Sequence, residues 1–216
     1  MTKPNFTEIV VVLDRSGSMD LIKKDMEGGY DNFMREQRLT PGECKVSLYQ
    51  FDTEYEVVYE SVPINDVKPL MLIPRGWTAL YDAVANTIVR TGERYSKLPE
   101  HERPSKVLFM VITDGEENRS VEYSISKNGA QRVKSLIEHQ TKNYQWAFVY
   151  LGSTMNTQED ASKIGIAVAA NFVPTSRGVE NMFSAVNDAA SKYRLSSDTK
   201  SRMSLPKNIG EEDKTP

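Results

Sequence analysis

The chain has 216 residues, of which 39% are hydrophobic and 26% are charged, as in an ordinary globular protein. This length allows one well-buried domain and does not require a second. The net charge of -3 argues against a nucleic-acid-binding protein, because such proteins present a strongly basic face.

Cys44 is the single cysteine, so no intramolecular disulfide can form. The first residues lack the apolar centre of a signal peptide, and no uninterrupted apolar run approaches the about 20 residues that a membrane span needs. We therefore expect a cytoplasmic protein that does not associate with a membrane.

The first half of the chain alternates apolar runs with amphipathic segments. An unbroken apolar run at residues 9–13 predicts a strand buried on both faces, as parallel strands are. Apolar residues at helical spacing then predict a helix around residues 22–33. A strand at 45–51 is followed by a short spacer and a second strand at 55–60. This spacing predicts a hairpin, whose second strand is antiparallel and lies at a sheet edge.

The second half continues the same alternation of helices and strands. Apolar runs predict strands at 107–112, 146–151 and 168–173. Amphipathic segments between and around these strands predict helices at 80–88, 130–137, 158–164 and 179–186. The pattern predicts a doubly wound α/β fold with a mostly parallel central sheet and helices on both faces. We expect the domain to span residues 1–195, followed by a mobile, polar C-terminal tail at 196–216.

The segment Asp14-Arg15-Ser16-Gly17-Ser18 follows the first apolar run, where a buried strand should end and a helix begin. It presents one carboxylate and two hydroxyls, spaced by two residues, on one tight turn. Hard oxygen ligands of this kind suit a small hard cation such as Mg2+. Ligands of open α/β sheets also bind at the carboxyl ends of the strands, so this turn is a candidate site.

Two later segments place oxygen atoms where the same edge of the sheet should lie. Thr78 precedes the helix at 80–88, and Asp114 follows the strand at 107–112. The strands that carry Asp14 and Asp114 would be neighbours in a doubly wound sheet, so both loops would converge on one crevice. Taken singly, Ser18 and Thr78 could each act only as a helix cap.

The order of Asp-x-Ser-x-Ser, Gly-x-Thr and Thr-Asp-Gly in this chain resembles the von Willebrand factor type A family, whose metal-ion-dependent adhesion site is built from these residues. The resemblance covers roughly residues 7–195. In that family the sheet is mostly parallel with one antiparallel edge strand.

The resemblance implies a metal-binding role for each of these side chains. Ser16 and Ser18 would bind Mg2+ directly, and Asp14 would bind it directly or through a water. Thr78 and Asp114 would alternate between direct and water-mediated contact, and Mn2+ or Ca2+ would be substitutes for Mg2+. A shell of mainly neutral hydroxyls leaves the dication under-neutralised, so an Asp or Glu carboxylate of a partner protein would complete it.

Gly76-Trp77 stands where the family usually has Gly-Gly. An exposed Trp77 would be a partner-binding anchor, whereas a ring folded over residues 74–75 would be structural. We expect Glu116, Glu117 and Asn118 to form a solvated loop and Asp82 to occupy an exposed helix position.

The resemblance implies a bacterial or phage adaptor module that binds a partner protein. We expect it to bind no nucleic acid and not to be an enzyme. Two alternatives stay open: a Mg2+-dependent phosphohydrolase with Asp14 as nucleophile, and a scaffold in which the metal is incidental. The phosphohydrolase would need a second acid two residues after the nucleophile, where this chain has Ser16.

Overall fold

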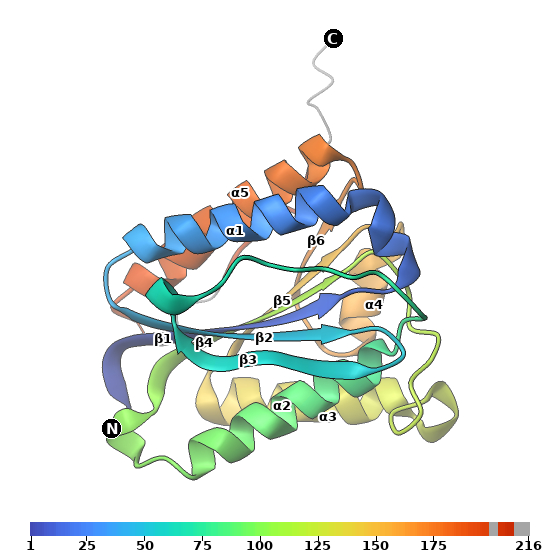
Figure 1. Cartoon of the computed structure of the whole chain (residues 1–216). Helices are drawn as coiled ribbons and strands as arrows, with labels where there is room; N and C mark the ends of the chain where they lie inside the picture. Colours follow the sequence, from blue (N-terminus) through green and yellow to red (C-terminus); the bar gives the residue numbers. More distant parts are fainter. Residues whose placement is uncertain (199–202, 210–216) are drawn as a thin grey trace.

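The computed structural model describes residues 1–198 and 203–209. Its centre is a seven-stranded sheet with the strand order β3-β2-β1-β4-β5-β6-β7 (Figure 1). Only β3 runs antiparallel to its neighbour within this sheet. The strands are β1 (Lys3–Asp14), β2 (Glu43–Phe51), β3 (Tyr55–Pro63), β4 (Pro104–Thr113), β5 (Ala147–Gly152), β6 (Val168–Phe172) and β7 (Asn208–Ile209).

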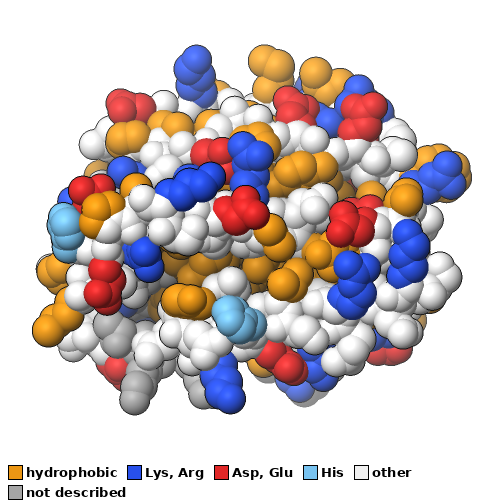
Figure 2. All heavy atoms as spheres, turned by 90° about the horizontal axis from the view of Figure 1, so that it is seen from below, with side chains coloured by type: hydrophobic (Ala, Val, Ile, Leu, Met, Phe, Trp, Pro, Cys, Tyr) orange, Lys and Arg blue, Asp and Glu red, His pale blue; other side chains and the backbone are white. Residues whose placement is uncertain are grey.

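Helices cover both faces of the sheet, with α1 and α5 on one side and α2, α3 and α4 on the other (Figure 1). Seen from the side of α2 and α3, the surface intersperses apolar, basic and acidic side chains (Figure 2). The α-helices are α1 (Lys23–Leu39), α2 (Leu80–Ser96), α3 (Gly129–Tyr144), α4 (Thr157–Lys163) and α5 (Ser176–Leu195). Short 3-10 turns occupy η1 (Gly17–Ile22), η2 (Ile64–Asp66), η3 (Glu100–Glu102) and η4 (Ile125–Lys127). None of the helices within the described ranges combines the length and apolarity that crossing a bilayer requires.

Strand β1 explains why the apolar runs are unbroken. Successive side chains of a strand point to opposite faces, so Ile9 and Val11 join the hydrophobic cluster under α1 and α5, while Val10 and Val12 join the cluster under α2 and α3. All four side chains are fully buried. The predicted fold class, with its antiparallel edge strand, is therefore confirmed.

The segment expected to be a polar tail differs from the prediction where the structure describes it. Residues 203–209 return to the sheet, and β7 pairs in parallel with β6 through Asn171 and Asn208. Met203 and Ile209 are buried against the cluster that includes α5. Isolated apolar residues in a polar segment give no periodic signal, which is why the sequence pattern does not reveal this strand. The rest of the predicted tail after residue 198 lies outside the described residues.

The strand order brings the candidate site residues to one edge of the sheet. β1 lies between β2 and β4, and Leu13 of β1 is paired with Ile112 of β4. Asp14 and Thr113 therefore end neighbouring parallel strands at the same edge. We call this edge the carboxyl edge. Here the chain leaves β1 toward α1 on one face of the sheet and leaves β4 toward α3 on the other face. Such a point is the usual location of a ligand site in open α/β sheets.

Candidate metal centre

Asp14 is the buried anchor of the site. It ends β1 and is 0% exposed. Its Oδ1 accepts a 2.6 Å hydrogen bond from the backbone N–H of Ser16, and its Oδ2 accepts a 2.6 Å bond from the hydroxyl of Thr113. One bond closes the turn and the other ties it to β4, so the carboxylate has a fixed orientation.

The two carboxyl groups of the site share an environment that disfavours their charges. The pKa of Asp14 is raised to about 6, because burial, together with the nearby charge of Asp114, outweighs the hydrogen bonds from Thr113 and Ser16 that would lower it. Burial also raises the pKa of Asp114, against the bond from Ser18. Two close carboxylates with raised pKa values are what a cation would stabilise.

The hydroxyls of Ser16 and Ser18 face each other and the carboxylate of Asp114. The two Oγ atoms are 3.2 Å apart, and Ser18 donates a 2.7 Å hydrogen bond to Oδ1 of Asp114. Ser16 occupies the N-cap position of η1, yet no side-chain cap hydrogen bond forms there. Helix capping therefore does not account for these two hydroxyls.

Thr78 reaches the same place from the loop before α2. It is buried, and a methyl group placed on Gly115 would lie 3.1 Å from Thr78 Oγ1 and 3.8 Å from Asp14 Oδ2. α2 has Ala79 at its N-cap and no side-chain cap bond, so the Thr78 hydroxyl does not cap the helix either. The backbone of Thr78 is held on both sides by Asn118, whose Oδ1 accepts from Thr78 N–H and whose N–H donates to the Thr78 carbonyl.

Glu116 and Asn118 are exposed, as expected of a solvated segment, whereas Glu117 and Asp82 instead anchor backbone N–H groups. Glu117 accepts bonds from the backbone N–H groups of Tyr81, Arg119 and Ser120. Asp82 accepts bonds from three successive N–H groups at 121–123. Neither acid is exposed: both are partly buried. The signal that points to Asp82 is its place in the first turn of α2, where an acid is favoured.

The five predicted ligands therefore meet at one point, and they fit a hard cation. The set is two carboxylates and three hydroxyls, and no group of three or more His, Cys, Asp or Glu side chains suited to a metal occurs within residues 1–198 and 203–209. Oxygen donors without imidazole or thiolate suit Mg2+ or a similar ion better than a soft metal. The residues present thus fit the metal that the resemblance implies.

Several solved structures resemble this chain. A von Willebrand factor type A protein from Catenulispora acidiphila aligns at a TM-score of 0.57 and 13% identity, over 86% of this chain and 42% of its own. The ArnB paralog VWA2 from Sulfolobus acidocaldarius aligns at 0.52 and 15%, over 87% and 44%. Proximal thread matrix protein 1 from the mussel byssus, with a zinc-occupied MIDAS motif, aligns at 0.56 and 16%, over 86% and 46%. This chain has the von Willebrand factor type A fold.

At these identities the likeness establishes the fold alone. The chain spans less than half the length of each of the three structures. No protein-family model and no curated protein sequence matches it.

An ion-pair network holds the turn at residues 14–18 against the loop that carries Thr78. Asp52 Oδ2 accepts from Arg15 Nε at 2.7 Å and from Arg75 Nε at 2.9 Å. Arg15 also pairs with Glu56, and Arg75 pairs with Glu54. Burial would raise the pKa of Asp52, but the hydrogen bonds from the Glu54 backbone and the two arginines outweigh it and lower that pKa. The network keeps Asp52 charged and the two loops in register.

Trp77 points outward at the edge of the candidate metal centre. The residue is 64% exposed, and its backbone N–H donates to the hydroxyl of Thr53 at 3.0 Å. Its exposure is what a partner-binding anchor requires, although that role stays a prediction.

Proposed function

We propose that this chain is a metal-dependent protein-binding module. In this proposal Asp14, Ser16, Ser18, Thr78 and Asp114 hold Mg2+, and a partner protein supplies an Asp or Glu carboxylate that completes the coordination. The observation that carries the proposal is that three hydroxyls, none used as a helix cap, converge with two carboxylates at the carboxyl edge.

The charge of the donor set supports binding over storage of the ion. Hydroxyl ligands add no negative charge, so where Asp14 or Asp114 contacts the ion only through a water, the dication keeps an attraction for an outside carboxylate. A Mg2+ ion also keeps waters that such a group can displace. We propose that the module is a cytoplasmic adaptor. We also propose that it has no phosphohydrolase activity, because Ser16 stands where such an enzyme would need its proton-donating acid.

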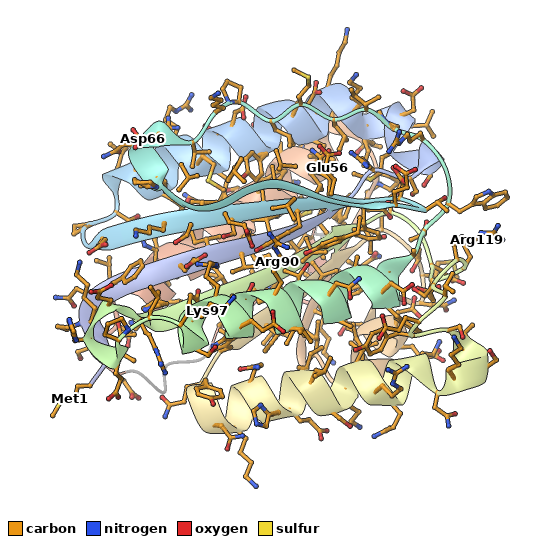
Figure 3. The ribbon with its side chains drawn as sticks, turned by 60° about the horizontal axis from the view of Figure 1, so that its bottom comes forward. Met1, Glu56, Asp66, Arg90, Lys97 and Arg119 are labelled. Carbon is orange, nitrogen blue, oxygen red and sulfur yellow. The ribbon has the colours of Figure 1, made fainter. Side chains whose placement is uncertain are left out.

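The test is calorimetric titration of Mg2+ and Mn2+ into the wild type and Asp14→Asn, with Zn2+ as a comparison metal. Asp66→Asn is the control, because Asp66 is an exposed acid on η2, away from Arg119 on the carboxyl edge (Figure 3). We expect metal binding in the wild type and in Asp66→Asn, and none in Asp14→Asn. Equal binding by Asp14→Asn and the wild type would refute the site.

A further inference from the structure

Exposed apolar side chains occur on several loops that follow or precede the elements at the carboxyl edge. We call five of them the apolar rim: Leu21 from η1, Trp77 before α2, Val121 and Ile125 after β4, and Met155 after β5. Each residue is at least 64% exposed. Single exposed apolar residues are ordinary, but several on the loops that flank one candidate site indicate an interaction surface.

Arg119 adds an unpaired positive charge beside this rim. Its backbone N–H donates a 3.2 Å hydrogen bond to the carbonyl of Thr78, so the backbone of Arg119 lies next to a residue of the candidate metal centre. Within the described ranges its guanidinium contacts no carboxylate, whereas Arg15 and Arg75 both bind Asp52. Arg119 is exposed, and it lies at the end of the molecule opposite Lys97 (Figure 3).

We infer that the partner presents two acidic residues within an apolar segment, one for the metal site and one for Arg119. This inference rests on the proposed function and specifies its partner. A guanidinium binds a carboxylate through two parallel hydrogen bonds, and the apolar flanks would cover Trp77 and the rest of the rim. A carboxylate alone buries far less than the about 800 Å² per partner of a standard interface.

Charge favours a protein partner over an anionic membrane. Asp20 and Glu116 are exposed on the loops of the same edge and form no salt bridge with a described residue, so they would repel an anionic lipid surface; Glu122 is paired with Arg132. A partner with two acids at fixed positions can instead engage the metal and Arg119 while avoiding Asp20 and Glu116.

The experiment selects a displayed random peptide library on the wild type in Mg2+, removes peptides that bind Asp14→Asn, and elutes with EDTA. We expect selected peptides to carry two acids among apolar residues. Arg119→Ala should weaken binding by about tenfold, and so should changing to an amide the peptide acid that pairs with Arg119. The two changes combined should weaken binding hardly more than either alone, because both remove the same contact. Lys97→Ala is the control for the charge lost in Arg119→Ala. Tyr144→Ala is the control for the exposed aromatic side chain lost in Trp77→Ala. We expect Arg119→Ala and Trp77→Ala to weaken peptide binding and both controls to leave it unchanged.

The outcomes separate the two proposals. If the wild type yields no peptide whose binding needs both Mg2+ and Asp14, the proposed function is wrong and the inference falls with it. If binding depends on Asp14 but the peptides carry one acid, or Arg119→Ala weakens acid and amide peptides equally, only the inference is wrong. Binding of the wild type to phosphatidylserine vesicles that Arg119→Ala abolishes would likewise overturn it, in favour of a membrane.

Discussion

The hydroxyl of Ser18 donates a 2.7 Å hydrogen bond to Oδ1 of Asp114, across 96 residues of sequence. The bond joins the turn after β1 to the end of β4, the two neighbouring strands on which the candidate site is built. Ser18 is exposed and its backbone belongs to a short 3-10 turn. The Ser18 side chain is therefore part of the candidate site and is not part of the hydrophobic core.

Ser18→Ala should separate metal binding from folding. We expect Mg2+ affinity to fall by about 10–100-fold, because one oxygen donor and the partner of Asp114 are removed together. The midpoint of thermal unfolding should stay close to the wild type, since surface substitutions usually change stability by less than about 0.5 kcal/mol. Ser96→Ala, an exposed serine at the end of α2, is the matched control. Unchanged metal affinity in Ser18→Ala would remove this hydroxyl from the ligand set.

Asp14→Asn should stabilise the metal-free protein at neutral to alkaline pH. The pKa of Asp14 is raised from 3.8 to about 6 in the folded state, so its contribution to stability is present at low pH and is lost as the pH rises through about 6. The amide is isosteric, and the Thr113 hydroxyl can accept its N–H while donating to the Gly115 carbonyl. Above the folded pKa the variant should gain about 1–3 kcal/mol, because one pKa unit corresponds to about 1.4 kcal/mol.

Urea unfolding in EDTA near pH 8 and near pH 4.5 measures this difference. The gain of Asp14→Asn over the wild type should be large at the higher pH and small at the lower one. Added Mg2+ should stabilise the wild type and not the variant, because only a protein that binds the ion gains from it. A gain that is equal at both pH values would show that Asp14 is not charged at a cost in the metal-free fold.

The sequence predicts the core of the sheet, and it predicts that five oxygen-bearing side chains lie together at one edge, for physical reasons. Strands buried on both faces must be continuously apolar, as β1 is. Ligands at the carboxyl ends of neighbouring strands must be polar residues placed directly after apolar runs, as Asp14 and Asp114 are. Both signals are local in sequence, so periodicity and position are enough to find them.

The anchors of the site are not visible in the same way. Asp82 and Glu117 look like exposed acids, because their partners are backbone N–H groups that carry no side-chain signal. The pairing of Arg15 with Asp52 joins residues that only the assembled sheet brings together. These contacts depend on loop conformation, which one sequence does not specify.

Gly76→Ala should weaken both the fold and the metal site. Gly76 has φ +67, and a Cβ there would lie 2.8 Å from the hydroxyl of Thr53, which holds the backbone of Trp77. We expect a loss of about 1–3 kcal/mol in the free energy of unfolding and weaker Mg2+ binding, because the shift propagates to Thr78. Gly28→Ala is the control: a Cβ there meets nothing within 4 Å, and helix propensity predicts a gain of about 0.5–1 kcal/mol. Similar effects of the two substitutions would show that the loop tolerates a side chain.

Ile209→Ala tests whether the end of the described chain belongs to the domain. Ile209 is 5% exposed and lies in β7, paired with Phe172 of β6. We expect its truncation to cost about 2 kcal/mol in urea unfolding, at the low end for buried aliphatic residues because β7 is a two-residue edge strand. Leu195→Ala, at a residue that is 60% exposed at the end of α5, should change stability by less than about 0.5 kcal/mol. If the two variants are equally stable, residues 203–209 contribute little to the fold and the prediction of a polar tail from residue 196 is the better description. A clear loss in Ile209→Ala alone would place the seventh strand within the cooperative unit that supports the carboxyl edge.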